Sequence, residues 1–264
     1  MDKPIGVIDS GLGGLSLTKV LVKTLPKESI VYIADSKNCP YGGKTEEEIY
    51  RLTRRMVKYL LKRKIKLLIV ACNTITVTSI NDLREEFKDI PIVGMVPVIK
   101  TAAQKTRNGK IGVYSTVVTS KSKYQKDLIN KFASGIDVIN IGSSALVSLI
   151  EKGKDKEIES VLREELNIFK ENNIGTLALG CSHFPLIKRQ IAKILPEVLI
   201  LDSSGAVSRQ VKRILEANGM LPTSKDSVYN FITTGNKDFF EKFVKKTLGK
   251  KLTNKAKIER ISLQ

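Results

Sequence analysis

Residues 67–74 read Leu-Leu-Ile-Val-Ala-Cys-Asn-Thr, and this stretch decides the fold class. Its opening run, Leu67-Leu68-Ile69-Val70, is continuously apolar, which is typical of a strand that helices cover on both faces. Small and polar residues follow at once, and a helical pattern begins at Thr74. A buried strand that passes straight into a helix predicts an α/β fold built on mainly parallel sheets.

The same alternation recurs along the 264 residues of the chain. Nine apolar runs are many for one sheet, so we expect two sheets and two domains. No Pro/Gly/Ser-rich linker separates the halves, which favours closely packed domains with a cleft between them. The predicted strands are Ile5–Ile8, Ile30–Ala34, Leu67–Ala71, Ile92–Val93, Ile111–Tyr114, Val138–Ile141, Thr176–Leu179, Val198–Leu201 and Val228–Ile232. The predicted helices are Thr45–Leu61 (which opens with Thr45 and Glu48 at capping-box spacing), Thr74–Phe87, Ser122–Phe132, Ile158–Lys170, Ser204–Asn218 and Lys237–Leu248.

The chain is strongly basic, with 45 lysines and arginines against 27 aspartates and glutamates and a formal net charge of +18. Such an excess predicts attraction of nucleic acid or anionic ligands, or simply a lysine-rich solvated surface. The basic residues are scattered and no recognisable nucleic-acid motif occurs, which favours the solvated surface. Such a surface is also compatible with attraction of an anionic substrate.

The sequence contains no apolar run of about 18 residues, the length that a membrane span requires. The amino-terminal segment also lacks the features of a signal peptide, so we expect a cytoplasmic protein with no membrane partner. The cysteines are Cys39, Cys72 and Cys181, and an odd number without regular spacing argues against a disulfide framework. In a reducing compartment all three should be thiols.

Four segments place small polar residues directly after an apolar strand. Ligands bind beyond the carboxyl ends of strands in open α/β sheets, so these segments should face a common crevice. The first contains a glycine-rich turn, which suits either an anion-binding loop or a tight strand-to-helix connection. Asp9 favours the binding loop, because an acid at the carboxyl end of a strand has no packing role. The segments are Ile8-Asp9-Ser10-Gly11-Leu12-Gly13-Gly14, Ala34-Asp35-Ser36, Val70-Ala71-Cys72-Asn73-Thr74 and Leu179-Gly180-Cys181-Ser182-His183.

Cys72 and Cys181 are the sharpest feature of the sequence. Each ends a predicted strand and precedes an expected helix start, a position that favours the reactive thiolate. A buried cysteine by itself is often only a small apolar residue. Two cysteines in matching contexts point instead to a shared chemical role.

His183 is the single histidine of the chain and lies two residues after Cys181. It could hold a thiol proton or the substrate, or serve as a structural histidine. Cys72, Cys181, His183 and one carboxylate could also ligate zinc, although a lone Cys-x-His pair is not the usual spacing of a structural site. A protease-like Cys-His nucleophile would need one thiol only and leaves Cys72 unexplained.

Two thiols suit the inversion of a stereocentre. One base cannot easily reach both faces of a held carbon, so a thiolate must remove the proton from one face and a thiol return it to the other. The developing charge would need dense hydrogen bonding from backbone N–H and Ser/Thr/Asn groups, which cluster beside both cysteines. The sequence therefore predicts a racemase that moves an α-proton between Cys72 and Cys181.

These motifs resemble those of the glutamate racemases of bacterial cell-wall synthesis, over nearly the whole chain. Their order and combination carry the resemblance more than any single motif. Two positions depart mildly from the family pattern, since Ser182 stands where threonine is usual and Phe184 where tyrosine is usual. The matching segments are Asp9-Ser10-Gly11-Leu12-Gly13-Gly14, Pro40-Tyr41-Gly42, Ala71-Cys72-Asn73-Thr74, Ile150-Glu151-Lys152-Gly153, Gly180-Cys181-Ser182-His183-Phe184-Pro185-Leu186 and Thr233-Thr234-Gly235.

The resemblance implies cofactor-independent interconversion of L- and D-glutamate, which supplies D-glutamate for peptidoglycan synthesis. It implies two doubly wound, mainly parallel-sheet domains with the active site in the cleft between them. The first domain would hold residues 1–96 and 207–264, and the second residues 97–206. No pyridoxal phosphate or metal is implied, no nucleic acid is required, and a homodimer is compatible with the resemblance.

The roles of single residues carry over in the same way. Cys72 is implied to deprotonate D-glutamate with Asp9 as its helper, and Cys181 to deprotonate L-glutamate with Glu151 and His183 as helpers. The alternatives are a racemase of aspartate or a hydantoin within the same superfamily and, in another class, a basic anion- or nucleic-acid-binding protein. The implied substrate contacts are Asp9, Ser10, Tyr41, Gly42, Asn73, Thr74, Thr116, Thr119, Ser182 and His183.

Overall fold

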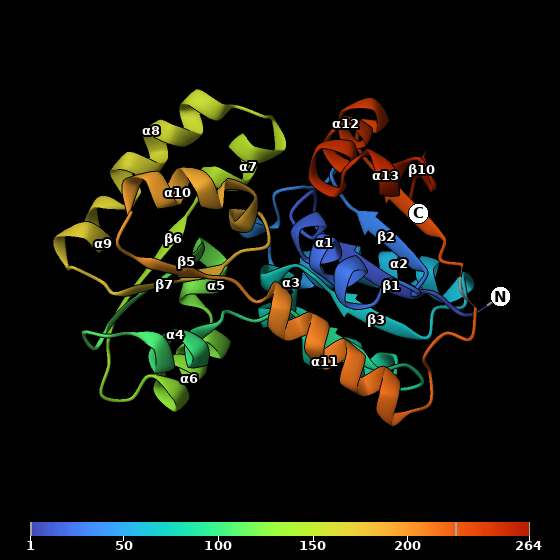
Figure 1. The fold of residues 1–264 in the computed structure, drawn as a ribbon, viewed down its shortest axis with the longest axis horizontal. Coiled ribbons are helices and arrows are strands. Elements are labelled where there is room, and N and C mark those ends of the chain that lie inside the picture. The colour runs from blue at the N-terminus through green and yellow to red at the C-terminus, as the bar shows by residue number, and fades with distance from the viewer. Residues whose placement is uncertain (1, 225, 264) are drawn as a thin grey trace. The chain divides into compact units, whose positions relative to one another are not determined.

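The computed structural model describes residues 2–224 and 226–263. The chain divides into two compact units, unit 1 with Met1–Met95 and Ser204–Gln264 and unit 2 with Val96–Ser203 (Figure 1). Each unit is built on one parallel sheet, so the predicted α/β class with two mainly parallel sheets is confirmed. Within the described ranges, no helix combines the length and the apolar character that crossing a membrane requires.

Unit 1 holds a six-stranded sheet in the order β10-β9-β2-β1-β3-β4, with every neighbouring pair parallel. Its strands are β1 (Ile5–Asp9), β2 (Ile30–Ala34), β3 (Leu67–Val70), β4 (Ile92–Gly94), β9 (Tyr229–Thr233) and β10 (Ala256–Arg260). Its helices are α1 (Leu15–Thr24), η1 (Tyr41–Gly43), α2 (Glu46–Lys62), α3 (Asn73–Glu86), α11 (Ser204–Ala217), α12 (Lys237–Leu248) and α13 (Lys250–Thr253). Helices α11 and α12 pack against α1, and α2 packs against α3, so both faces of the sheet are covered.

Unit 2 holds a four-stranded parallel sheet in the order β6-β5-β7-β8. Its strands are β5 (Lys110–Thr116), β6 (Asp137–Ser143), β7 (Thr176–Gly180) and β8 (Leu199–Leu201). Its helices are α4 (Ile99–Lys105), α5 (Val117–Lys121), α6 (Lys123–Phe132), α7 (Leu146–Glu151), α8 (Asp155–Glu165), α9 (Asn167–Glu171), η2 (Phe184–Ile187) and α10 (Lys188–Ile194). Helices α4 and α6 lie on one face of the sheet, and α8 and α10 lie on the other (Figure 1).

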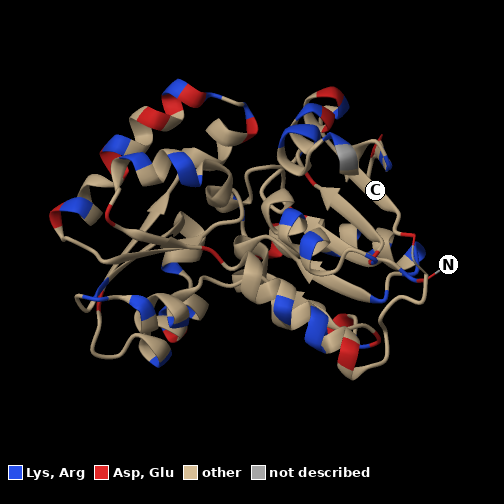
Figure 2. Cartoon of the chain, in the orientation of Figure 1, with Lys and Arg blue, Asp and Glu red and all other residues tan. Residues whose placement is uncertain are grey.

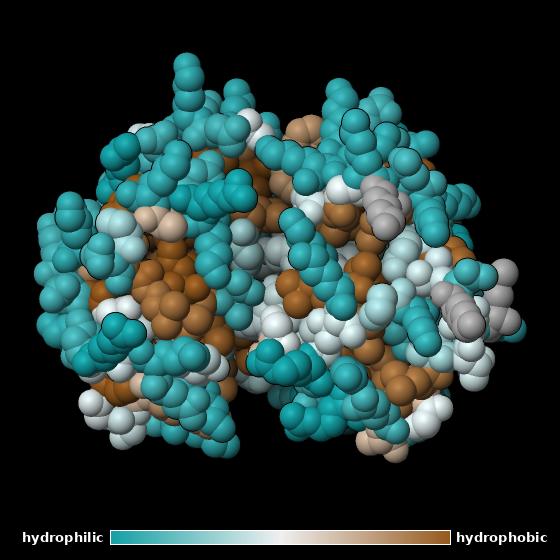
Figure 3. Space-filling view, viewed as in Figure 1, coloured by the Kyte–Doolittle hydropathy of each residue, from teal (hydrophilic) through white to brown (hydrophobic). Residues whose placement is uncertain are grey.

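The central strands supply the core, because they are buried on both faces. In unit 1, Ile5 and Val7 of β1 pack with Leu17 and Leu21 of α1, and all four side chains are fully buried. Burying one such side chain contributes ~1.5–3 kcal/mol before the entropy cost of folding is counted. The outer faces of the amphipathic helices α8 and α11 carry hydrophilic side chains (Figure 3). Lysine and arginine recur on helices of both units, in line with a scattered basic surface (Figure 2).

Helix α2 begins where the sequence predicts. The side chain of Thr45, in an extended conformation, accepts a hydrogen bond from the backbone N–H of Glu48 at 3.2 Å. The Glu48 carboxylate forms an ion pair with Lys44 at 2.7 Å. Thr45 therefore satisfies one of the backbone donors that a helix N-terminus leaves unpaired.

Several features of the chain differ from the prediction, which gives no range for helices α1, α4, α5, α7, α10 and α13. Strand β10 has no predicted counterpart, because it lies at the sheet edge and its half-exposed Ala-Lys-Ile-Glu-Arg sequence lacks an apolar run. The single predicted helix over Ile158–Lys170 is wrong, since α8 ends at Glu165 and α9 begins at Asn167. No glycine or proline marks this break, whereas Leu166 and Phe169 are both fully buried around it.

Candidate active site

Each unit carries a cysteine at the point where its strand order reverses. In unit 1 the chain adds β2 on one side of β1 and then returns to add β3 on the other. In unit 2 it adds β6 on one side of β5 and then β7 on the other. Cys72 follows β3 and Cys181 follows β7. Ligands of doubly wound sheets bind at this switch point, beyond the carboxyl ends of the strands, so each sheet presents one thiol at its own ligand-binding position.

Cys72 caps helix α3, as the sequence predicts. Its backbone is extended (φ −87°, ψ 123°), and its carbonyl accepts hydrogen bonds from the N–H and Oγ1 of Thr76 at 3.0 and 2.9 Å. Its Sγ lies 3.5 Å from Oγ of Ser10, which follows the neighbouring strand β1. The positive end of the helix dipole stabilises a thiolate here.

Asp9 ends β1 and is fully buried. The N–H of Gly11 donates to Oδ1 of Asp9 at 2.8 Å, and the hydroxyl of Tyr32 donates to the Gly11 carbonyl at 2.6 Å. A Cβ at Gly14 would lie 2.9 Å from Cβ of Ala71, which is closer than real side chains pack. This part of the glycine turn therefore serves the tight connection from strand to helix, while Asp9 is oriented by the backbone of the same turn.

Asn73 follows Cys72 and is 1% exposed. Its side-chain oxygen and nitrogen are both buried, and neither has a hydrogen-bond partner among the residues that the structure describes. A buried amide without a partner costs ~1–3 kcal/mol for each unsatisfied group. Such a cost is tolerated where a ligand supplies the missing bonds, so the amide of Asn73 can bind a polar substrate. The next residue, Thr74, is also buried.

Tyr41 and Gly42 lie in the short helix η1 and are held through Asp35. The sequence placed the segment Ala34-Asp35-Ser36 at the ligand crevice but gave Asp35 no role. The Tyr41 hydroxyl donates to Oδ2 of Asp35 at 2.6 Å, and Thr234 Oγ1 donates to Oδ1 at 2.7 Å. Burial raises the pKa of Tyr41 well above its ordinary value, and the charge of Asp35 adds to this shift, so the phenol stays protonated. The signal for Asp35 was its position, since it directly follows β2, while Asp9 is the last residue of β1.

Cys181 directly follows β7, but the element after it differs from the predicted helix start. A turn comes first, in which the Phe184 N–H donates to the Cys181 carbonyl at 3.2 Å, and then the short helix η2. Pro185 stands in the first turn of η2, where a missing N–H is tolerated. The turn leaves Cys181, Ser182 and His183 together at the strand end, and all three are buried.

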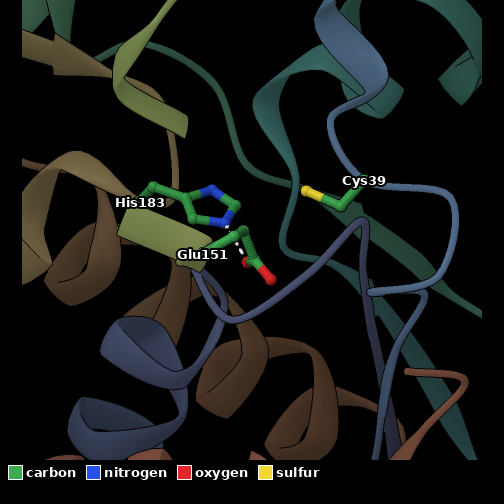
Figure 4. A group of neighbouring side chains, drawn as sticks. All are labelled: Cys39, Glu151 and His183. Carbon is green, nitrogen blue, oxygen red and sulfur yellow. Dashed lines mark hydrogen bonds and ion pairs between the residues drawn. The ribbon is translucent and has the colours of Figure 1, made fainter. Parts of the chain in front are cut away.

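The buried His183 and the half-buried Glu151 form a pair in unit 2. Nε2 of His183 lies 2.6 Å from Oε1 of Glu151, the last residue of α7 (Figure 4). A carboxylate that is ionised only accepts hydrogen bonds, so Nε2 would be the donor to an ionised Glu151. On the other side of the ring, Nδ1 lies 3.4 Å from Oγ of Ser182. These contacts determine the orientation of the imidazole beside Cys181, and they bring together three residues that the sequence assigned to this site.

Thr116 and Thr119 also meet in unit 2. Thr116 ends β5 and caps α5, accepting from the Thr119 N–H at 3.3 Å and donating to Thr119 Oγ1 at 3.0 Å. Ser115 of β5 pairs in register with Gly180 of β7, so Thr116 lies at the same sheet edge as Cys181. Both threonine hydroxyls therefore lie at the switch point of this sheet.

Glu165, at the end of α8, supports this edge and was also not assigned from the sequence. Its carboxylate accepts hydrogen bonds from the hydroxyl of Tyr114 and, at 3.1 Å, from Ser143 Oγ. Burial raises the pKa of Tyr114, and the bond to Glu165 adds to it, so this phenol remains a donor. No local pattern marks Glu165, because it lies 51 residues from Tyr114 in the sequence.

The family model of the Asp/Glu/hydantoin racemases matches residues 5–211. A glutamate racemase of Clostridium novyi (strain NT) is 40% identical over 251 residues, which cover 93% of this chain and 97% of that protein. The crystal structure of Escherichia coli glutamate racemase in complex with L-glutamate matches with a TM-score of 0.87 at 30% identity and 99% coverage of both chains. That of the Francisella tularensis enzyme in complex with D-glutamate matches with a TM-score of 0.85 at 33% identity, covering 100% of this chain and 98% of that one. The resemblance seen in the sequence is thus confirmed, and the chain belongs to the Asp/Glu/hydantoin racemase family.

Proposed function

We propose that this protein interconverts L- and D-glutamate without a cofactor, using Cys72 and Cys181 as its two bases. The observation that carries the proposal is the repeated placement of one cysteine at the switch point of each sheet. The similarity to relatives named glutamate racemase supports glutamate over aspartate or a hydantoin as substrate. Two of these relatives bind opposite enantiomers, L-glutamate in one and D-glutamate in the other.

The proposed reaction moves one proton off the α-carbon and one proton onto it. With D-glutamate, the thiolate of Cys72 takes the α-proton, and the thiol of Cys181 delivers its proton to the opposite face. One C–H bond breaks on one face of the α-carbon and another forms on the opposite face, so the product is the enantiomer. The protonation states of the two sulfurs are exchanged at the end. L-glutamate reacts in the reverse sense, starting from Cys181 thiolate. Each sulfur must lie within hydrogen-bond reach of the carbon it serves.

The neighbouring groups would assist each sulfur in turn. Ser10, in contact with the Cys72 sulfur, and the buried Asp9 beside it would orient that side of the site. The His183–Glu151 pair would do the same for Cys181. Hydrogen bonds to the substrate stabilise the charge that develops when the α-proton leaves. The groups proposed to supply these bonds are Asn73, Thr74, Tyr41, Gly42, Thr116, Thr119, Ser182 and His183.

The proposal extends to the organisation and role of the protein. The two units, Met1–Met95 with Ser204–Gln264 and Val96–Ser203, would act as two domains. Their bounds lie close to the predicted division into residues 1–96 with 207–264 and residues 97–206. The enzyme would work in the cytoplasm and supply D-glutamate for peptidoglycan synthesis. Growth of a D-glutamate auxotroph on expression of this chain would support that role, and failure of an active enzyme to restore growth would contradict it.

The test of the mechanism is a circular-dichroism assay with purified protein, D-glutamate and no added cofactor. Wild-type protein should racemise the substrate, and Cys72→Ser and Cys181→Ser should each lower turnover by ~10²–10⁴-fold, the usual contribution of an acid–base group. Cys39→Ser is the matched control, since it removes the remaining thiol and should leave turnover near the wild-type value. If either active-site variant kept more than a tenth of wild-type turnover, the two-thiol mechanism would be wrong.

The substrate is tested separately by proton exchange. Wild-type protein in deuterium oxide is incubated with L-glutamate, L-aspartate or a 5-substituted hydantoin, and loss of the α-proton signal is followed by NMR. Exchange should be fastest with glutamate. Faster exchange with aspartate or the hydantoin would keep the mechanism and overturn the choice of substrate.

A further inference from the structure

A basic groove lies on unit 1, away from the residues assigned to racemisation. Its volume is about 590 Å³, and side chains of α2 and of the segment after β10 line it. Most of the lining side chains are basic, and none of those described is acidic. The lining residues are Arg51, Arg54, Arg55, Lys58, Tyr59, Lys62, Ser262 and Leu263.

The positive charge of this groove is largely uncompensated within the described part of the chain. Arg54 alone has an ion pair there, with its Nε 2.5 Å from Oε1 of Glu86. The other four basic side chains form neither a hydrogen bond nor an ion pair with any described residue. Arg51, Lys58 and Lys62 are exposed, and Arg55 is half-buried. Four cationic groups therefore face the groove without a fixed counter-ion.

The fold does not require this arrangement. Helix α2 packs through its other face, with buried residues Ile49, Leu52, Thr53, Met56, Val57 and Leu60. Arg51 and Arg55, and Lys58 and Lys62, are like-charged pairs at i and i+4, which destabilise an isolated helix. A row of cations that costs helix stability, and in which four of five side chains have no ion pair with a described residue, indicates an external anion.

We propose that this groove binds an oligophosphate, meaning at least three linked phosphates, either free or as the tail of a nucleotide. Guanidinium groups bind phosphate oxygens in a bidentate manner, and ammonium groups add point charges. From Arg51 to Lys62 the row extends ~16 Å along the helix, at 1.5 Å per residue, which suits a linear anion with several charges. The groove has the volume of a small-molecule pocket, usually ~300–1,000 Å³, and this favours a bounded ligand over a nucleic-acid strand.

The test is isothermal titration calorimetry of the full chain with inorganic tripolyphosphate at constant ionic strength. Wild-type protein should bind one equivalent. Lys58→Gln with Lys62→Gln should weaken binding at least tenfold. Lys19→Gln with Lys23→Gln is the matched control, because these exposed lysines have the same i, i+4 spacing on α1 and line no part of the groove. It should change affinity less than twofold.

Two further arms identify the ligand. ATP that binds more tightly than tripolyphosphate, with the gain abolished by Tyr59→Leu, identifies a nucleotide whose base stacks on that ring. Equal affinities identify the free oligophosphate. The proposal fails if tripolyphosphate gives no saturable heat, if both lysine pairs weaken binding equally, or if a 20-nucleotide single strand binds more tightly than either ligand. Thermal melts establish that each variant is folded. Since no arm measures racemisation, failure here is distinct from failure of the proposed function.

Discussion

The ring of Tyr114 packs against the ring of Phe184, with their centroids 4.7 Å apart and their planes tilted by 39°. Tyr114 belongs to β5, whereas Phe184 immediately follows His183 in the turn beyond β7. The hydroxyl of the same tyrosine donates to Glu165. The carboxylate at the end of α8 thereby holds the ring that supports the His183 turn.

Glu165 also reaches the helix that carries Glu151. It accepts a hydrogen bond from Ser143 Oγ, and that oxygen accepts the N–H of Leu146 at 3.2 Å, where α7 begins. Glu151 ends the same helix. Through Tyr114 and Ser143, one carboxylate is therefore linked to both the turn that carries His183 and the helix that carries Glu151.

Replacing Glu165 by glutamine should lower kcat for L-glutamate by about tenfold, which corresponds to ~1.4 kcal/mol of transition-state stabilisation. The amide keeps the size of the side chain but weakens both hydrogen bonds, so His183 and Glu151 should lose their alignment. Steady-state kinetics in both directions measure the effect, which should exceed that on KM. Glu164→Gln, at an exposed position on the same helix, is the control and should be silent. An unchanged kcat in Glu165→Gln would contradict the positioning role.

Asp35 should be a major contributor to the stability of unit 1. This residue is 1% exposed and accepts hydrogen bonds from Tyr41, Thr234 and Asn38. Asparagine would replace one acceptor oxygen by an NH₂ group, which cannot accept the hydrogen bonds that its neighbours donate. Asp35→Asn should therefore lower the free energy of unfolding by ~2–3 kcal/mol. Urea unfolding measures the loss. Thr234→Val removes one donor and should lower the free energy of unfolding by less. A loss below about 0.5 kcal/mol in Asp35→Asn, roughly the noise of the assay, would contradict the role of Asp35 in stability.

Gly180 should tolerate no side chain. A Cβ at this position would lie 2.9 Å from Cβ of Ser115 and 3.2 Å from Cγ of Pro97. Gly180→Ala should therefore shift Cys181, the next residue, and lower both turnover and stability, the latter by ~1–3 kcal/mol as for other overpacked cores. Gly205→Ala is the control, because its Cβ meets only Arg209 at 3.4 Å and alanine is the better helix former. Thermal melts and the racemisation assay distinguish the two variants, and equal behaviour would argue against a steric cause.

Glu86 should make the stability of unit 1 depend on acid pH. Burial opposes the shift, but hydrogen bonds from Tyr50 and Arg54, at 2.5 Å each, lower the pKa of Glu86 below its ordinary 4.5. The stabilisation is complete above the unfolded pKa and is lost as the pH falls through the folded one. Wild-type protein should therefore be more stable than Glu86→Gln at pH 7, with the difference shrinking below pH 4.5. Urea unfolding across this range provides the measurement, and a constant difference would contradict the assigned shift.

All nine strands predicted from apolar runs are present, because a strand buried on both faces must be apolar at nearly every position. Strand β10 escaped prediction because its apolar residues alternate with polar ones, whereas the other edge strands, β4, β6 and β8, each contain adjacent apolar residues. The cap at Thr45 and the position of Cys72 before α3 depend on adjacent residues, and both were correctly predicted.

Local order along the chain thus determined the fold class, the strands and the family, because burial on both faces and helix capping act over a few neighbouring residues. Only the tertiary structure revealed that Asp35 accepts hydrogen bonds from both Tyr41 and Thr234, the latter 199 residues away, and that Glu165 holds the ring of Tyr114. Hydrogen bonds between distant segments depend on sheet order, which brings the carboxyl ends of β2 and β9 side by side. No periodicity or spacing within a segment encodes that neighbourhood.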